Sequence, residues 1–282
     1  MITELAAVAL AAASPWARDW WVGLCERYTE PQMVIGGTFV SLVVGYALGC
    51  MPYVLLDWLR WPPAAAYKLQ PSRYVSRRVA LHTSAYVLFL FVCVMLPLIV
   101  VGSGALSLLG VTLDPDRLPS AGTIAVQTAY FFLVEDFGNY WLHRALHTPW
   151  LYQAVHRVHH EHDAPFALAA TYAHPVEVVV LGLPTFAGPL AVGPHLLTLW
   201  VWVLLRNYEA IDIHSGYELP AAANRVAGWI AGAAHHDYHH AHYSGNFASV
   251  FTWCDRLYGT SIGFEALQAR KAAAAAKQGK LA

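Results

Sequence analysis

Three short clusters of histidine determine which chemistry this sequence could perform. They are His143-Arg-Ala-Leu-His147, His156-Arg-Val-His159-His160 and His236-Asp-Tyr-His239-His240. Histidines three or four residues apart lie on one face of a helix, so each cluster can aim its imidazoles at a common point. Neutral imidazole is a ligand for iron, zinc and copper, and one ion takes about four to six donors. Because the clusters hold eight histidines, they predict two metal ions.

The alternative is that these histidines only pack or lie on the surface. That interpretation suits a lone histidine in an apolar segment, such as His82 or His195. It suits the three clusters poorly, because each buried imidazole without a partner would cost about 1–3 kcal/mol. Packing also gives no reason for the spacing HxxHH to occur twice. The sequence therefore favours a metal centre.

The composition points to a membrane. Of the 282 residues, 57% are hydrophobic and 12% are charged, whereas soluble domains carry about 25% charged residues. The net charge is -1 and no basic run is interleaved with aromatic residues, so a nucleic-acid partner is not expected. The four cysteines have no CxxC spacing, which argues against a disulfide framework or a zinc ribbon.

The apolar segments predict an all-α integral membrane bundle with about four transmembrane or re-entrant helices. Residues 1–32 resemble an interfacial segment, and two spans are expected at about 33–56 and 79–101. A third helix, 121–147, is about 40 Å long and would carry the first histidine cluster beyond the bilayer. The connector 57–78 holds five of the 17 Lys and Arg residues, which predicts that it faces the cytosol.

The rest of the chain is expected to form a histidine-rich helical cap on that same side. A helix at 150–161 would bear the second cluster. Residues 176–209 are apolar but interrupted by Pro184, Gly188-Pro189 and Gly193-Pro194, which favours a helical hairpin or two thin spans. We divide the chain into an amino-terminal part with two spans, a catalytic region and a tail, within one integrated domain: 1–120, 121–264 and 265–282.

Acidic residues near the clusters allow two interpretations. Asp136 lies seven residues before His143, and its carboxylate could orient a ligand imidazole or be satisfied by a Tyr or Trp away from any metal. Glu135 is a weaker candidate. Asp212 and Asp237 could each accept an imidazole N–H or cap a helix, and the position of Asp237 inside the third cluster favours the first role.

The choice of metal follows from the setting. Zinc held by histidines can activate water, but hydrolysis requires neither two ions nor a hydrophobic scaffold. Two redox-active irons with O2 can oxidise an unactivated C–H bond, and lipids are the substrates that arrive through a membrane. The residues therefore favour an O2-dependent lipid hydroxylase, demethylase or desaturase over a hydrolase.

The clusters and several further segments resemble the fatty acid hydroxylase and sterol desaturase superfamily, and within it the C-4 methylsterol monooxygenases. The similarity is strong over about 130–264. The segments that carry it are Trp141-Leu-His-Arg-Ala-Leu-His147, His156-Arg-Val-His-His-Glu-His-Asp-Ala-Pro-Phe166, Tyr172-Ala-His-Pro-Val-Glu177, Ile211-Asp-Ile-His-Ser-Gly-Tyr217, His235-His-Asp-Tyr-His-His240, Gly245-Asn-Phe-Ala-Ser249 and Phe251-Thr-Trp-Cys-Asp-Arg-Leu-Tyr-Gly-Thr260.

The resemblance implies an oxidase that converts a sterol C4 methyl group stepwise through alcohol and aldehyde to carboxylate. It would use two Fe ions, with zinc as an occasional substitute, O2, and electrons from NAD(P)H delivered by an external carrier, cytochrome b5 and its reductase. Other enzymes of sterol C4 demethylation would be further partners. The histidines of the three clusters would be catalytic metal ligands, joined by His214. A tenth ligand could be His174 or His235, while His162 and His242 would only neighbour the clusters.

Alternatives share these features. The same centre could serve a fatty acyl or sphingolipid hydroxylase, a sterol C5 desaturase or an aldehyde decarbonylase, and a non-enzymatic zinc-binding membrane protein is the alternative outside enzymes. The resemblance implies the endoplasmic reticulum. The ending Lys277-Gln-Gly-Lys280-Leu-Ala282 lacks a dilysine retrieval signal, so a bacterial inner membrane stays open as the location.

Overall fold

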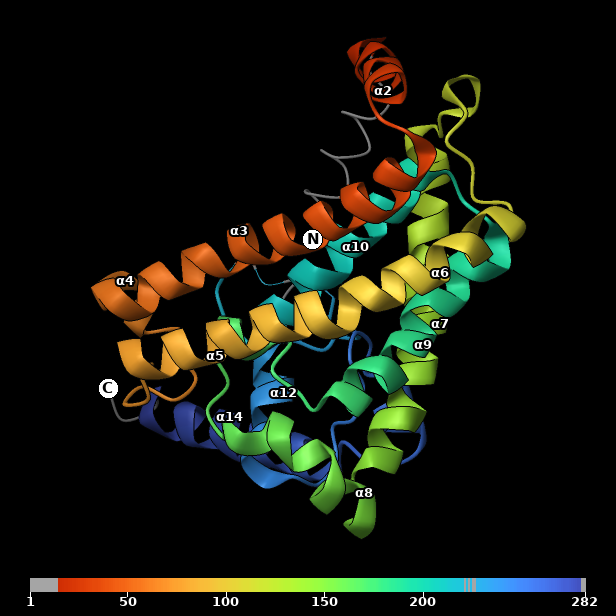
Figure 1. Ribbon diagram of the computed structural model, residues 1–282. Helices are drawn as coiled ribbons and strands as arrows, with labels where there is room; N and C mark the ends of the chain where they lie inside the picture. The colour runs from red at the N-terminus through yellow and green to blue at the C-terminus, as the bar shows by residue number, and fades with distance from the viewer. Residues whose placement is uncertain (1–14, 221, 223, 225–226, 280–282) are drawn as a thin grey trace.

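A computed structural model describes residues 15–220, 222, 224 and 227–279. No β-strand occurs among these residues, which form helices joined by short turns (Figure 1). The first fourteen residues of the expected interfacial segment and the last three residues of the tail lie outside the described part. The long helices are α2 (Pro15–Arg27), α3 (Thr38–Leu59), α5 (Arg77–Leu90), α6 (Leu96–Leu108), α7 (Ala121–Leu146), α9 (Pro175–Val192), α10 (Leu196–Ile213) and α14 (Ile262–Gly279).

Shorter elements complete the chain. Two π-helical segments continue into longer helices, η1 (Gln32–Gly37) into α3 and η2 (Phe91–Met95) into α6. The short α-helices are α4 (Pro62–Ala65), α8 (Pro149–Ala154), α12 (Ala233–His242) and α13 (Trp253–Leu257). The 3₁₀ turns are η3 (Pro115–Arg117), η4 (His156–Glu161) and η5 (Ala167–Ala169).

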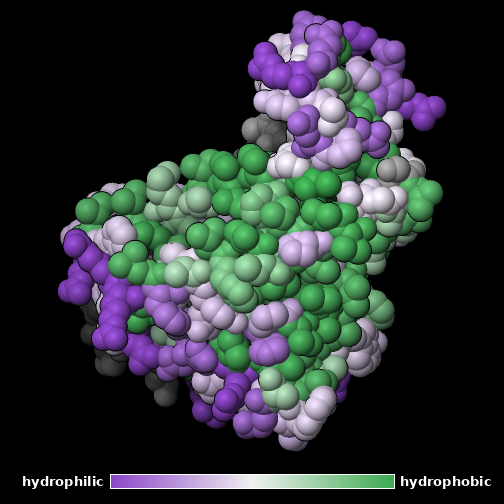
Figure 2. Space-filling view, in the orientation of Figure 1, coloured by the Kyte–Doolittle hydropathy of each residue, from purple (hydrophilic) through white to green (hydrophobic). Residues whose placement is uncertain are grey.

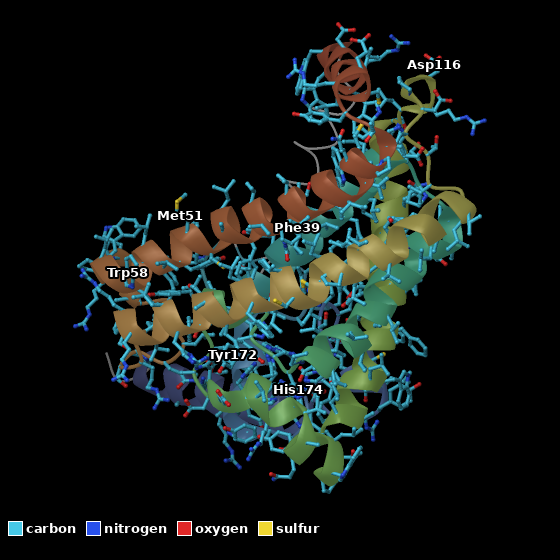
Figure 3. The ribbon with its side chains drawn as sticks, viewed as in Figure 1. Phe39, Met51, Trp58, Asp116, Tyr172 and His174 are labelled. Atoms are coloured by element: carbon cyan, nitrogen blue, oxygen red, sulfur yellow. The ribbon has the colours of Figure 1, made fainter. Side chains whose placement is uncertain are left out.

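In the part of the chain that the structure describes, three helices are long and apolar enough to cross a membrane: Gln32–Leu59, Arg77–Leu106 and Pro175–Val192. Only 17%, 17% and 22% of their most apolar windows are buried, so most of their apolar side chains face outward, as those of a lipid-embedded helix must. Met51 and Trp58, for example, project from α3 away from the bundle (Figure 3). The protein is a helical bundle of an integral membrane protein, as the composition predicted.

Hydrophobic surface covers α3, α5 and α6 in a broad band, while hydrophilic residues gather at the two ends (Figure 2). In Figure 1, α2 lies at one end of the molecule, and α8, α12 and α14 lie at the other. The helices α3 and α5–α6 diverge from α7 and α9 toward this second end (Figure 1). We call the structure at this end, formed by residues 147–174 and the described residues of 214–279, the cap.

Close helix packing explains several glycines. A Cβ added at Gly45 would lie 2.5 Å from a terminal methyl group of Leu204, so the small size of glycine lets α3 and α10 pack closely here. A Cβ at Gly138 would lie 2.6 Å from Pro184, which brings α9 equally close to α7. These contacts hold α10 against α3 and α9 against α7, and a cluster histidine directly follows both α7 and α10.

The two amino-terminal spans agree with the sequence expectations, and the later segments bring two corrections. In the apolar stretch 176–209, α9 packs on α7 and α10 packs on α3. The chain turns between them at Gly193-Pro194, whereas Pro184 and Pro189 lie inside α9. The second cluster does not lie on an α-helix over 150–161. Helix α8 ends at Ala154, Val155 leaves helical geometry with φ -130° and ψ -65°, and the histidines occupy the 3₁₀ segment η4.

The predicted third span, α7, is a helix of 26 residues but is not one of the three apolar candidates. Its Glu135 and Asp136 are fully buried inside the protein, where Arg206 lies 2.9 Å from Glu135. These charges lower its hydropathy, and neighbouring helices rather than lipid surround them.

Candidate metal centre

The structure brings nine histidines into two adjacent groups, with His143 near the end of α7 and the other eight in the cap. Cluster A comprises His143, His147, His156, His160 and His239, and cluster B comprises His159, His214, His236 and His240. Within each cluster one nitrogen of every ring lies within 4.8 Å of the others. Eight of the nine side chains are buried, and His147 is half-buried.

The Nε2 atoms of the rings converge. In cluster A, His156 Nε2 lies 3.1 Å from the Nε2 atoms of both His143 and His160. In cluster B, His214 Nε2 lies 3.3 Å from that of His159 and 2.9 Å from that of His236. Imidazole nitrogens about 2.0–2.1 Å from one ion and about 90–110° apart would be about 2.9–3.4 Å from each other. The spacing of the donors therefore fits a shared metal ion.

Hydrogen bonds at the opposite ring nitrogen set the tautomers. His159 Nδ1 lies 3.0 Å from the carbonyl oxygen of Tyr172, and His214 Nδ1 lies 2.7 Å from that of Ala210. A carbonyl only accepts, so each Nδ1 carries the proton and each neutral ring presents a bare Nε2. Two bare nitrogens facing each other repel unless a cation lies between them. This donor set therefore fits a metal ion better than a network of imidazole hydrogen bonds.

Burial keeps the rings in the metal-binding form. It lowers the pKa of His147 and of His159 to about 4, and it lowers the pKa of His160 and His236 further, with neighbouring imidazoles adding to the effect. A metal binds imidazole only when the ring is neutral. All of these rings are consequently ready to bind at neutral pH.

The clusters differ from the sequence expectation in one respect. The sequence predicts that each of the three histidine motifs, which we call boxes, aims at one point. Instead, the histidines of the second box (His156–His160) and of the third box (His236–His240) divide between clusters A and B. On α12, His236 and His240 enter cluster B while His239 enters cluster A. Successive residues of an α-helix are about 100° apart, so His239 and His240 point to adjacent sites. In both boxes the first and last histidines, four residues apart, belong to one cluster, and the middle histidine belongs to the other cluster.

Comparison with known proteins shows the family of this chain. The family described as Fatty acid hydroxylase matches residues 128–260. Methylsterol monooxygenase 1-3 of Arabidopsis thaliana is 35% identical over 264 residues, which cover 93% of this chain and 89% of that protein. The chain belongs to the fatty acid hydroxylase and sterol desaturase superfamily.

Other relatives in the superfamily carry a second name. The very-long-chain aldehyde decarbonylase GL1-10 of Oryza sativa subsp. japonica is 43% identical over 250 residues, which cover 86% of this chain and 82% of that protein. A further relative with the first name, methylsterol monooxygenase 1-1 of Arabidopsis thaliana, is 41% identical over 231 residues, which cover 80% of this chain and 76% of that protein. No solved structure is significantly similar to the chain. Membership of the superfamily supports an oxidoreductase whose histidine clusters bind metal.

Two histidines considered as a tenth ligand lie outside both clusters. His174 caps the start of α9, where its Nδ1 accepts the N–H of Val176 at 3.2 Å. It lies in the segment that leads into α9, below α5 in Figure 3. His235 Nε2 lies 3.5 Å from Asp255 Oδ2. His162 and His242 also lie outside the clusters, and His195 caps α10. In this structure these positions supply no tenth imidazole.

The acidic candidates contact other groups. Asp136 accepts the backbone N–H groups of Val250 and Phe251 at 2.8 and 2.9 Å, which places it under a loop rather than beside an imidazole. Asp212 accepts the hydroxyl of Tyr53 at 2.5 Å. Asp237 accepts the amide of Gln70 at 2.9 Å. These carboxylates hold the elements around the clusters.

The acid beside a cluster histidine is Glu177, which the sequence reasoning did not select. Its Oε1 lies 2.8 Å from His156 Nδ1, with both side chains buried. A carboxylate at this position orients the ring and raises the basicity of Nε2. The signal in the sequence was an acid at the start of an apolar helix, in the segment His174-Pro-Val-Glu177.

Proposed function

We propose that this protein is a di-iron, O2-dependent methylsterol monooxygenase that oxidises a C4 methyl group. The observation that carries the proposal is the convergence of nine Nε2 atoms into two adjacent sites at the end of a lipid-exposed bundle. The methylsterol monooxygenases that the chain matches over most of its length support the sterol as substrate.

The chain's own residues have three tasks in this reaction. The nine Nε2 atoms would hold two iron ions, which with O2 and electrons supply the oxidation of an unactivated C–H bond. The Nδ1–H groups of His159 and His214, bonded to main-chain carbonyls, fix those rings. Burial of the rings keeps bulk water from the reacting methyl group.

The overall stoichiometry requires an external reductant. Each step from methyl to alcohol, from alcohol to aldehyde and from aldehyde to carboxylate consumes one O2 and two electrons, and it releases water. We propose that cytochrome b5 and its reductase deliver electrons from NAD(P)H at the cap. The connector 57–78, which carries Lys and Arg residues, contacts the cap through Gln70 and Arg73, and this supports a cytosolic cap. The related methylsterol monooxygenases support a location in the endoplasmic reticulum.

A second function is favoured by a specific observation. The rice proteins named very-long-chain aldehyde decarbonylase are 39–43% identical to this chain, so the same centre could act on a long-chain aldehyde. A rigid sterol and a flexible acyl chain place different demands on the space between the spans. The two substrates therefore separate the candidates.

The test uses the full-length protein in detergent, loaded anaerobically with iron. We expect about two iron ions per chain and O2-dependent conversion of a 4-methylsterol to the hydroxymethyl and carboxyl products with a chemical reductant. Conversion of a long-chain aldehyde to the hydrocarbon one carbon shorter, with no sterol product, would assign the second function. Tight zinc without O2 consumption on either substrate would contradict both.

A further inference from the structure

We propose that Asp255 is a positioning residue for cluster A: it holds a loop, Gly245–Phe251, whose carbonyls orient His143 and His239. The proposal rests on metal binding by cluster A, which is part of the proposed function. It does not depend on which lipid is the substrate. The loop connects the buried carboxylate of Asp255 to the imidazoles whose Nε2 atoms would bind the metal.

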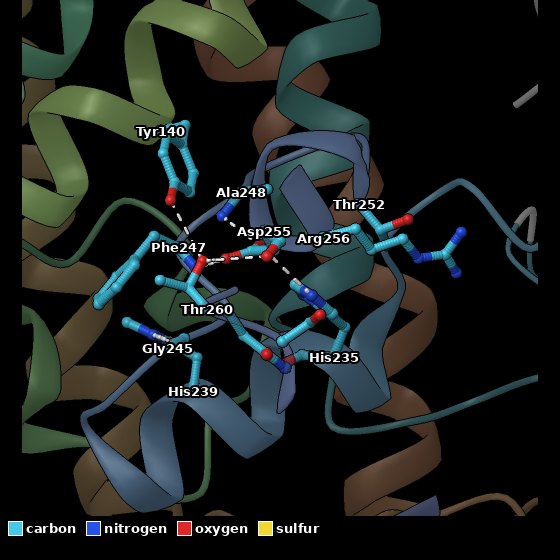
Figure 4. Close-up of polar contacts among 12 residues, drawn as sticks. Tyr140, His235, His239, Gly245, Phe247, Ala248, Thr252, Asp255, Arg256 and Thr260 are labelled. Carbon is cyan, nitrogen blue, oxygen red and sulfur yellow. Dashed lines mark hydrogen bonds and ion pairs between the residues drawn. The ribbon is translucent and has the colours of Figure 1, made fainter. Parts of the chain in front are cut away.

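Asp255 is a fully buried acid at the centre of a set of donors (Figure 4). Its two oxygens accept the backbone N–H groups of Phe247 and Ala248, both at 2.9 Å. Its Oδ1 also accepts the hydroxyl of Thr260 at 2.5 Å. Charge-assisted hydrogen bonds from two successive N–H groups fix the direction of the peptide between them.

The same loop residues face cluster A with their carbonyls. The carbonyl oxygen of Phe247 accepts His143 Nδ1–H at 2.8 Å. The carbonyl oxygen of Gly245 accepts His239 Nδ1–H at 2.8 Å (Figure 4). These bonds place the proton on Nδ1 and leave Nε2 bare for a metal. Two of the five imidazoles in cluster A thus depend on the position of a single loop.

The loop would not adopt this conformation unaided. Gly245 and Asn246 have positive φ angles of 86° and 55°, a region in which non-glycine residues are uncommon. A Cβ at Gly245 would lie 2.3 Å from the carbonyl oxygen of Thr260. Asn246 is fully buried and donates its N–H to that same carbonyl at 2.9 Å. Hydrogen bonds to residues outside the loop hold it in place. Asp255 and Thr260 make such bonds next to the carbonyls that contact His143 and His239.

The far end of the loop is held separately. Asp136 on α7 accepts the N–H groups of Val250 and Phe251, beyond the residues whose carbonyls contact histidine. Cluster B has no contact of this kind with the loop among the described residues. Loss of the Asp255 carboxylate should consequently affect cluster A and spare cluster B.

The experiment measures Co2+ binding to the full-length protein in detergent, by visible absorption and by competition with a chelator. In Asp255→Asn, one oxygen becomes an amide that cannot accept an N–H. We expect Co2+ affinity at cluster A to fall about 10–100-fold, so that tightly bound Co2+ falls from about two ions to about one per chain. Unchanged Co2+ affinity at both clusters, or an equal loss of affinity at both, would overturn the proposal.

Asp57→Asn is the matched control. Asp57 is another buried acid, which accepts Lys68 Nζ at 2.9 Å and the hydroxyl of Tyr217 at 2.6 Å, away from the loop. This variant should lower thermal stability yet keep cluster A intact, and loss of cluster A metal here would show that any buried defect has the same effect.

Thr260→Val covers the case in which Asp255→Asn does not fold. It keeps the carboxylate and removes one donor, so a smaller loss of affinity, confined to cluster A, is expected. An unchanged spectrum would count against the proposal. Cobalt binding requires no substrate, so failure of the sterol assay and failure of this test are distinguishable.

Discussion

Clusters A and B lie side by side but are built differently. Cluster A has five imidazoles, and the partners of its outer nitrogens include a carboxylate, Glu177, and two carbonyls of one loop. Cluster B has four imidazoles, and the partners found for its outer nitrogens are main-chain carbonyls, those of Tyr172, Ala210 and His162.

This difference indicates that the two metal ions would not be equivalent. A buried carboxylate behind an imidazole raises its basicity and stabilises positive charge on the metal, which favours cluster A as the tighter site. Four imidazoles leave more coordination positions than five, and a catalytic metal keeps an open position for an exogenous ligand. Cluster B is therefore expected to be the site with more room for such a ligand.

Removal of a ligand should have the largest effect. His156→Ala should abolish metal binding at cluster A, His236→Ala should abolish it at cluster B, and each should lower turnover by more than about 100-fold. Metal content and product formation measure this. His242→Ala is the control, because His242 is exposed on the same helix α12 and outside both clusters. Equal residual activity in all three variants would contradict a shared centre.

Removal of the carboxylate behind His156 should have the next largest effect. Glu177→Gln keeps the size of the side chain but loses its charge, so metal affinity at cluster A should fall about 10–100-fold while that at cluster B is unchanged. Chelator competition with each site resolved measures the difference. A uniform decrease at both clusters would show that Glu177 acts on the fold and not on one site.

Acidification should have a moderate effect that differs between the two clusters in how early metal is released. Burial lowers the pKa of His147 and His159 to about 4, whereas an unfolded histidine titrates at about 6.5. Between these values the unfolded chain binds protons that the folded chain does not, so stability falls as pH falls from about 6.5 to 4 and is unaffected above 6.5.

The expected slope is about 1.4 kcal/mol per pH unit for each such histidine, measurable as a lower melting temperature of the metal-free protein. His147 is half-buried, and the four rings of cluster B are buried. Protons should therefore reach cluster A first, and metal should leave it first. Earlier release from cluster B on acidification would reverse the comparison.

The smallest effect is expected from Tyr217→Phe. Tyr217 lies three residues after His214, and its hydroxyl donates a hydrogen bond to Asp57. Loss of this hydroxyl should lower the free energy of unfolding by about 1–2 kcal/mol. Metal binding at cluster B should persist, because His214 is oriented by Ala210 within its own helix. Denaturation and Co2+ titration of the same sample measure both. Loss of cluster B metal would show that this site also depends on distant contacts.

The sequence predicted the class of fold and eight of the nine clustered histidines, because apolar length and the spacing of imidazoles are local properties of the chain, whereas His214 was expected only from the family resemblance. It could not assign histidines to sites, since that depends on α8 ending at Ala154 and on the rotation between His239 and His240. The sequence also could not predict hydrogen bonds between residues that are far apart along the chain. The carbonyl of Phe247 reaches His143 over 104 residues, and main-chain carbonyls carry no mark in the residue types.

The order of the ligands along the chain has a consequence for assembly. The third histidine box, on α12 (Ala233–His242), follows all the spans, and the loop that orients His143 comes later still. A nascent chain that has not yet reached His236 offers cluster B only His159 and His214. Cluster B would therefore be completed only at the end of synthesis, after the described spans have been made, whereas cluster A already has four of its five imidazoles once His160 has been added.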